Sequence, residues 1–198
     1  MAKFIKDTAY NWNFGNSGQP PGVNYDCGYC GNKVAPVASM IGQVTIHGAP
    51  QNRHGWIYFC PVCLSPTFID GFDDQVPAVR LGAELNKLPE DGLKQLYNEA
   101  RDCSATGAYT ACVMACRKIL MNLAVREGAK AGGSFVGYVD YLADNNFVPP
   151  KGKAWVTRIK DKGNEANHEI KPMTAEDAKE ILYLVEMLLR FNFELGTP

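Results

Sequence analysis

Four of the seven cysteines stand in two Cys-x-x-Cys pairs, Cys27 with Cys30 and Cys60 with Cys63, and 29 residues lie between the pairs. Each pair is expected to form a tight turn whose backbone N–H groups face the sulfur atoms, and Gly31 suits the left-handed position after the first pair. Two such turns brought together form a tetrahedral cage of four thiolates, which zinc fills. Four protein ligands leave no position for a reactive water, so the spacing predicts a structural Zn²⁺ site.

The two cysteine pairs have alternative interpretations, and the remaining cysteines and two histidines need their own. The pairs could instead be two surface disulfides or a redox Cys-x-x-Cys, although an odd number of cysteines leaves at least one thiol unpaired. His47 and His54 lie between the pairs and could be ligands, or they could be ordinary strand and turn residues. Cys103, Cys112 and Cys116 recur on apolar helical faces, which predicts buried packing thiols.

A second constellation of polar residues lies near the end of the chain. Residues 151–171 hold six Lys or Arg against three Asp or Glu. Within this basic stretch Asn164 and His168 are four apart and share a face if the stretch is helical. A histidine can act as a general base near neutral pH, and beside a Lys or Arg it could cleave RNA without a metal by activating the ribose 2′-hydroxyl. In the alternative interpretation, Asn164 and His168 cap helix ends and bond the neighbouring backbone.

The elements that would position the cysteines are short strands. Apolar and β-branched runs predict strands at 43–47, 55–60 and 66–70, and residues 48–52 supply the turn of a hairpin. The opening stretch, which contains Tyr10, Trp12 and Phe14, is expected to be an irregular arm whose aromatic side chains lie on this small sheet.

Beyond Pro77 the apolar residues recur at helical spacing. Pro89 is placed at the first position of one helix, whose apolar face runs from Leu93 to Cys103. Thr174 and Asp177 resemble a capping box at the start of the last helix. The predicted helices cover the regions around 89–103, 108–123 (with Ala108 and Ala111 on its apolar face), 134–144, 155–159 and from 174 onward.

The composition excludes several classes of protein. The chain has 198 residues, 46% of them hydrophobic, and a formal net charge of −1, so no global charge draws it to nucleic acid or membrane. No apolar run is long enough for a membrane span or a signal peptide, and we expect a soluble cytoplasmic protein. The expected fold class is α+β, with a small β zinc ribbon at 1–75 and an all-α bundle of four to five helices at 76–198.

Several motifs of the helical half resemble those of a known family, the bacterial domain of unknown function 4145. The most specific is the Gly-Asn-x-Ala-x-His pattern that ends at His168, and a cysteine-knuckle module ahead of the helices is also similar to members of that family. The other matching motifs are Leu88-Pro89, Tyr97 to Ala100 with Cys103, Gly107 to Ala111, Arg117 to Leu120, Asp140 to Leu142 and the helix start at 174–177.

The resemblance implies a helical bundle similar to HEPN domains, which occur in bacterial defence proteins. Many of those domains are metal-independent ribonucleases that act as homodimers, with an Arg followed by four to six residues and then a His. Here Lys162 stands in that window before His168, and Arg158 lies further upstream. Lys keeps the charge of the Arg but not its bidentate fork.

Two functions follow as hypotheses. The first is a nucleic-acid-associated module of defence or stress systems that binds or cleaves RNA, with His168 as base, Lys162 or Arg158 as phosphate clamp and Asn164 orienting the histidine or substrate. The alternative is a non-catalytic protein-interaction or oligomerisation module stabilised by structural zinc.

Overall fold

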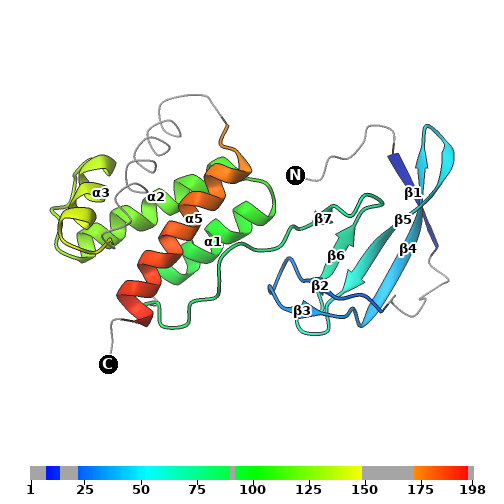
Figure 1. Ribbon diagram of the computed structural model, residues 1–198, viewed down its shortest axis with the longest axis horizontal. Helices are drawn as coiled ribbons and strands as arrows, with labels where there is room; N and C mark the ends of the chain where they lie inside the picture. The colour runs from blue at the N-terminus through cyan, green and yellow to red at the C-terminus, as the bar shows by residue number, and fades with distance from the viewer. Residues whose placement is uncertain (1–7, 14–21, 90–91, 149–171, 196–198) are drawn as a thin grey trace. The chain divides into compact units, whose positions relative to one another are not determined.

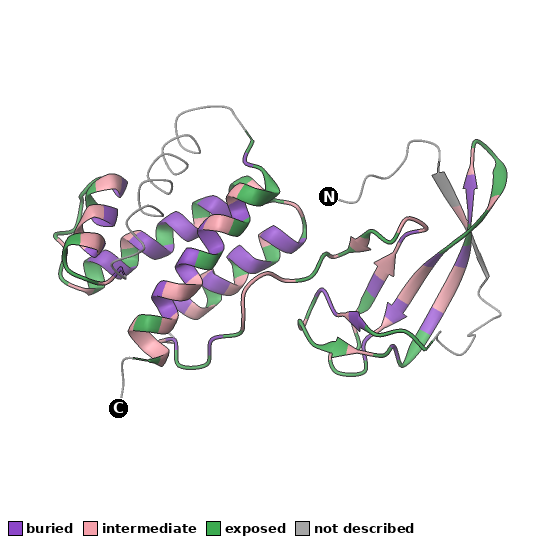
Figure 2. Ribbon diagram, viewed as in Figure 1, coloured by how far each residue is buried: buried purple, intermediate pink, exposed green. Residues whose placement is uncertain are grey.

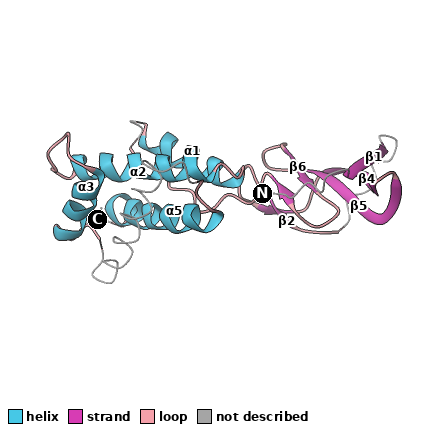
Figure 3. Cartoon of the chain, turned by 90° about the horizontal axis from the view of Figure 1, so that it is seen from above, coloured by secondary structure: helices cyan, strands magenta, loops and turns pink. Residues whose placement is uncertain are grey.

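The protein consists of two compact units, Met1–Arg80 and Leu81–Pro198. The computed structural model describes residues 8–13, 22–89, 92–148 and 172–195, and its strands all fall in the first unit and its helices in the second (Figure 1 and Figure 3). The expected α+β class is therefore confirmed. None of the helices described has the combination of length and apolarity that crossing a bilayer requires.

Antiparallel strands build the first unit. A five-stranded sheet has the order β1-β4-β5-β6-β7, and β2 and β3 form a separate two-stranded sheet. The strands are β1 (Thr8–Asn13), β2 (Tyr25–Asp26), β3 (Lys33–Val34), β4 (Ala38–Ile46), β5 (Ala49–Phe59), β6 (Pro66–Ile69) and β7 (Gln75–Val76). The three predicted strands are confirmed as parts of β4, β5 and β6.

The hairpin between β4 and β5 turns more tightly than the sequence suggested. Only His47 and Gly48 lie in the turn, with φ angles of 50° and 78°, and Ile46 pairs with Ala49 directly across it. Two positive φ angles match the right-handed twist of the flanking strands, so a two-residue turn suffices. The predicted hairpin is confirmed with Gly48 in its turn, but the turn does not extend over residues 49–52, because they belong to β5.

The described part of the N-terminal arm, Thr8–Asn13, is a strand and not an irregular segment. Tyr10 of β1 pairs with Val44 of β4, its ring meets Phe68 edge-on at 5.3 Å between centroids, and its hydroxyl accepts a hydrogen bond from the backbone N–H of Gly71 at 3.3 Å. The expectation that the arm's aromatic residues lie on the sheet is confirmed for Tyr10. The Trp12 side chain and Phe14 lie outside the described part of the chain.

Helix α2 is the centre of the second unit and packs against α1, α3 and α5. The helices are α1 (Leu93–Ala105), α2 (Tyr109–Arg126), α3 (Phe135–Asp144) and α5 (Ala175–Leu189), followed by the π-helical turn η2 (Arg190–Glu194). Their buried residues gather along α2 and α5 and form one continuous hydrophobic core (Figure 2). The helix predicted around 155–159 lies outside the described residues.

The helix boundaries confirm some of the predicted signals and correct others. The capping box of α5 is present, since the Thr174 hydroxyl accepts from the Asp177 N–H and the Asp177 carboxylate accepts from the Thr174 N–H. Helix α1 begins at Leu93 and not at Pro89, because Gly92, with φ 93°, breaks the path just before it. Ala108 and Ala111 were predicted on the core face of α2 but are exposed. Ala108 is the N-cap and Ala111 lies in the first turn, before the helix enters the core.

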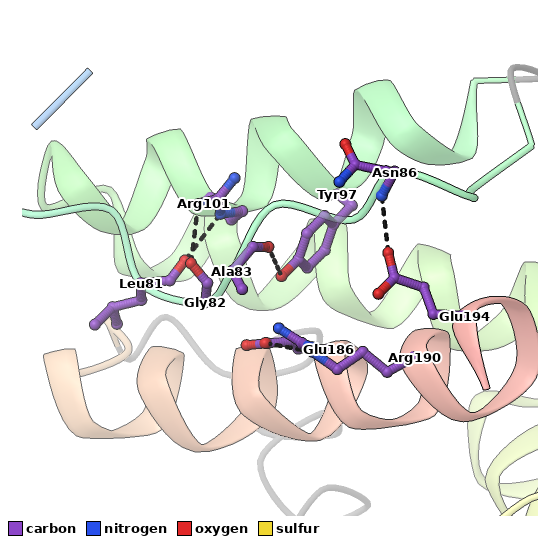
Figure 4. Close-up of polar contacts among 9 residues, drawn as sticks. All are labelled: Leu81, Gly82, Ala83, Asn86, Tyr97, Arg101, Glu186, Arg190 and Glu194. Atoms are coloured by element: carbon purple, nitrogen blue, oxygen red, sulfur yellow. Dashed lines mark hydrogen bonds and ion pairs between the residues drawn. The ribbon is translucent and has the colours of Figure 1, made fainter. Parts of the chain in front are cut away.

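Residues 81–88, which lead into α1, are fastened along the helices by side chains that bond their backbone (Figure 4). The buried guanidinium of Arg101 donates from Nε to the Leu81 carbonyl at 3.0 Å and from Nη2 to the Gly82 carbonyl at 2.9 Å. The Tyr97 hydroxyl donates to the Ala83 carbonyl at 3.0 Å.

The same segment is held further along by burial and by η2. Leu85 and Leu88 are buried in the hydrophobic core. The Asn86 N–H donates to a Glu194 carboxylate oxygen at 2.8 Å (Figure 4). Residues 81–88 are therefore an ordered part of the helical unit.

Candidate metal centre

Each cysteine pair lies in a loop that joins two antiparallel strands. The first knuckle, residues 27–32, connects β2 to β3, and the second knuckle, residues 60–65, connects β5 to β6. Asp26 pairs with Lys33 across the first loop, and Phe59 pairs with Pro66 across the second. The strand registers therefore fix both loops at the same length of six residues.

Backbone hydrogen bonds close the first knuckle. The Cys27 N–H donates to the Asn32 carbonyl at 2.9 Å, and the Gly31 N–H donates to the Cys27 carbonyl at 2.8 Å. Gly31 has φ 72°, as its type predicts. The Asn32 side-chain amide donates to the Cys30 sulfur at 3.3 Å, so the loop directs a donor at a ligand atom.

The second knuckle repeats this pattern with different residues. The Cys60 N–H donates to the Ser65 carbonyl at 3.2 Å, and the Leu64 N–H donates to the Cys60 carbonyl at 2.9 Å. The Val62 N–H points at the Cys60 sulfur at 3.4 Å. Leu64 occupies the position equivalent to Gly31 and has φ 58°, which is unusual for a residue with a branched side chain.

The two knuckles bring four sulfur atoms together. Cys27 and Cys63 are 3.7 Å apart between sulfurs, as are Cys30 and Cys60, and all four sulfurs lie within 4.8 Å of one another. A tetrahedron with metal–sulfur bonds of about 2.3 Å has edges of about 3.8 Å. A disulfide would need about 2.05 Å, and the cysteines are free thiols. The donor set fits a four-sulfur metal site, and the disulfide alternative is wrong.

The burial and closeness of these four sulfur atoms favour the binding of a cation. Cys27 and Cys60 have no exposed surface and share a small cluster with Tyr25 and Tyr58. Burial raises the pKa of the Cys27 thiol to about 12. Burial also acts to raise the pKa of Cys63, but hydrogen bonds with Ser65 and the neighbouring thiols outweigh it and lower that pKa to about 6. Four thiolates this close repel one another, and a bound cation removes that repulsion.

The chain that leaves the sheet lies against the first knuckle. A Cβ atom on Gly28 would collide with the carbonyl oxygen of Pro77 and lie 2.9 Å from that of Ala78. The Gln75 side chain donates to the Asp26 carbonyl and to the Pro77 carbonyl, each at 2.9 Å. Glycine at position 28 is thus required by close packing of two backbones.

The remaining predicted site residues are not part of the cluster. Neither His47, in the hairpin turn, nor His54, in β5, belongs to the group of ligand atoms. Cys112 and Cys116 are fully buried in the helical core, which confirms their prediction as buried packing thiols, whereas Cys103 packs against the core but is only partly buried. The proposed catalytic residues lie outside the described part of the chain: Arg158, Lys162, Asn164 and His168.

Two supporting residues escaped the sequence reasoning. Asn32 and Ser65 each stand two positions after the second cysteine of a pair, and the backbone carbonyl of each accepts a hydrogen bond from the N–H of the first cysteine. The Asn32 side-chain amide donates to the Cys30 sulfur, and the Ser65 hydroxyl donates to the Cys63 carbonyl. The signal was available: when the two hexapeptides, CGYCGN and CPVCLS, are aligned, a small polar residue ends both.

The fold and the cluster define a two-unit α+β protein with a four-cysteine centre in its β unit. Residues 98–197, just over half of the chain, match the model of a domain of unknown function, DUF4145. The chain belongs to this family, as the sequence motifs indicated, and the match covers most of the helical unit, from within α1 onward, and not the cysteine cluster. No curated protein and no solved structure matches the chain.

Proposed function

We propose that the cluster binds Zn²⁺, that the first unit is a zinc ribbon, and that the protein is a non-catalytic protein-interaction module. The observation that carries the proposal is the set of four sulfurs within 4.8 Å, with no histidine, carboxylate or open position among the described ligands. Zinc in such a site stabilises a fold and has no room for a substrate.

The surface of the knuckles supports binding to protein. Neither hexapeptide contains a charged residue, whereas binding to nucleic acid depends on Lys and Arg. Apolar side chains are exposed there instead, and we call Tyr29 (44% exposed), Val62 (61%) and Leu64 (71%) the knuckle surface. Exposed apolar residues around a rigid, metal-closed loop suit a partner protein with an apolar surface.

Metal analysis tests the first half of the proposal. We expect one zinc per chain in the purified protein, and Co²⁺ substitution should give the absorption of tetrahedral cobalt bound by thiolates. Cys63→Ser should reduce the zinc content, while Cys103→Ser in the helical unit should leave it unchanged. A fully folded β unit without any metal would refute the zinc assignment.

Surface substitution tests the second half. Val62→Asp with Leu64→Asp should abolish capture of a partner from cells of the source organism, whereas Val79→Asp, which changes an equally apolar exposed residue, should not. The partner must then bind the purified wild-type protein and not the double variant. If the double variant and wild type bind alike, the knuckle surface is not the interface.

A second candidate function rests on the basic stretch 151–171 and on the resemblance to HEPN domains. In this case the helical unit is a HEPN-like bundle that forms a homodimer and binds or cleaves RNA, with His168 as base. The test is RNA cleavage in the presence of a chelator, with wild type compared to His168→Ala. Equal activity in both proteins would remove the enzyme hypothesis.

A further inference from the structure

Among the described residues of the helical unit, two arginines are buried, and they differ in what they contact. Arg101 is 5% exposed and donates hydrogen bonds to Leu81, Gly82 and Asn98. Arg117, in α2, is 7% exposed, and no described group accepts a hydrogen bond from its buried Nη1. Its guanidinium lies 4.1 Å above the ring centre of Phe135. Arg101 thus stabilises the fold, whereas none of the residues that the structure describes balances the charge of Arg117.

An unbalanced buried cation requires an explanation. Burial lowers the pKa of Arg117 because water is excluded from the charged form. The face of an aromatic ring attracts a cation, but it supplies neither a negative charge nor a hydrogen-bond acceptor. A buried arginine is ordinarily paired with an anion. No described residue supplies that anion for Arg117, so a bound anionic ligand would satisfy it.

Arg117 also lines a cleft that an anion could enter. The cleft has a volume of about 530 Å³ and lies along α2 and the start of α3. Its described lining contains two cations and no acidic residue: Met114, Ala115, Arg117, Lys118, Met121 and Phe135. This volume falls within the range typical of small-molecule sites, roughly 300–1,000 Å³.

We propose that this cleft is a binding site for a phosphate attached to a nucleoside, with Arg117 and Lys118 holding the phosphate and the apolar side chains contacting the base. Two adjacent cations match the two negative charges of a phosphate monoester better than the single charge of a carboxylate. The guanidinium fork suits phosphate oxygens. The thioethers of Met114 and Met121 and the ring of Phe135 offer polarizable surfaces for a flat base.

The site is independent of the metal centre and of the knuckle surface, because all of its described residues lie in the second unit. The phosphate could belong to a free nucleotide or to the end of an RNA chain. Both carry the same group, so the two sources are separated by experiment.

Calorimetric titration of the full-length, zinc-loaded protein tests the proposal. Adenosine 5′-monophosphate should bind, and adenosine should bind at least about tenfold more weakly because it lacks the charge-assisted hydrogen bonds. A 5′-phosphorylated RNA oligonucleotide that binds more tightly than the mononucleotide would identify RNA ends as the source. Equal or weaker binding would identify the free nucleotide. Absence of binding by both probes at millimolar concentration would overturn the proposal.

Substitutions in the cleft test whether the mononucleotide binds there. Arg117→Met should weaken binding of the mononucleotide at least about tenfold without lowering the thermal midpoint, because apolar groups often replace a buried charge without loss of stability. Arg126→Met is the matched control: Arg126 lies on the same helix and also stacks on a ring, that of Phe193, but does not line the cleft. Binding that survives Arg117→Met would overturn the proposal.

A second variant guards against misfolding of the first. Met114 is 39% exposed at the edge of the cleft, so Met114→Glu leaves the core intact and places a negative charge beside Arg117. It should weaken binding of the mononucleotide clearly more than binding of adenosine, because repulsion of the phosphate adds to the loss of a base contact that both ligands share. An equal loss for both ligands would mean that the phosphate is not held where proposed.

Discussion

Single residues in the two knuckles are under different backbone constraints. Gly31 has φ 72° and open space where a Cβ atom would stand, whereas Gly28 has an ordinary φ but is packed against Pro77 and Ala78. One glycine is therefore required by conformation and the other by space. Leu64 accepts the conformational cost that Gly31 avoids.

Alanine substitution separates the two requirements. Gly31→Ala should cost about 1–2 kcal/mol of unfolding free energy, since a side chain is disfavoured at left-handed φ. Gly28→Ala should cost more, because the carbonyl oxygens of Pro77 and Ala78 must move. Denaturant unfolding of the zinc-loaded protein, with release of zinc to a chromogenic chelator as the second readout, measures both. A larger effect at Gly31 would contradict this account of the packing.

The buried phenol of Tyr97 should make the helical unit less stable as the pH rises into the alkaline range. Burial and, to a smaller extent, the nearby Glu186 raise the pKa of its phenol well above the ordinary value of 10.0. In the unfolded chain the phenol loses its proton near pH 10, so above that pH the folded state binds more protons than the unfolded state. The unfolding free energy should therefore fall as pH rises, by up to about 1.4 kcal/mol per pH unit from this group.

Far-ultraviolet circular dichroism during denaturant unfolding at about pH 9 and pH 11 measures the effect. Tyr97→Phe removes the titrating group and the hydrogen bond to Ala83. The variant should be less stable at neutral pH by about 1 kcal/mol and should lose less stability on going to high pH. An identical pH dependence in both proteins would rule out Tyr97 as its source.

At the scale of elements, the capping box of α5 is a local device with a measurable effect. Thr174 and Asp177 satisfy one another's backbone N–H groups at the helix start. Thr174→Ala should destabilise the helical unit by about 1 kcal/mol. Lys179→Ala is the control, since Lys179 is exposed and its contact with Glu176, at 3.8 Å, is a surface ion pair. Thermal unfolding followed at a helical signal compares them, and equal midpoints would contradict the role of the box.

Sequence reasoning located elements whose signals are local. The capping box, the Ser134 start of α3 and the cysteine spacing each depend on a few neighbouring residues. The strand β1 was missed because Thr8–Asn13 has weak strand character of its own and is held by its pairing with β4. Pro89 was mistaken for a helix start because the effect of Gly92, three residues later, was not weighed.

The candidate sites show the same limit. Spacing alone identified the four cysteines that the structure brings together as a candidate metal site. The cleft at Arg117 could not be found from the sequence, since periodicity cannot tell a buried arginine that has partners from one that lacks them. That distinction depends on which helices surround α2. The residues proposed for RNA chemistry stay a prediction.

At the scale of the whole molecule, the two units differ in how much apolar core they possess. The helical unit buries a large cluster drawn from all of its described helices. The cluster around the thiols has four buried members, two of which are the candidate metal ligands Cys27 and Cys60. We expect a unit with so small a core to depend on metal binding for much of its folding free energy.

Removing the metal should therefore unfold one unit and spare the other. After treatment with a strong chelator, amide hydrogen exchange should become fast in residues 22–80 and stay slow in α1, α2 and α5. Readdition of Zn²⁺ should restore the original pattern, which controls for irreversible damage. Loss of protection in both units together would show that their stabilities are coupled, and persistent protection in the β unit would show that the ion is dispensable.

The way residues 81–88 are held has a consequence for how this protein can change over generations. Tyr97 bonds the carbonyl oxygen of residue 83, which every amino acid possesses, so position 83 can change its side chain without loosening the attachment. Leu81 is more restricted, because its side chain packs against the hydrophobic core. Gly82 is the most restricted, because its φ of 74° and the Tyr97 hydroxyl 2.8 Å from its would-be Cβ leave no room for a substitute. Saturation mutagenesis should thus find position 83 permissive, position 81 limited to apolar residues and position 82 intolerant.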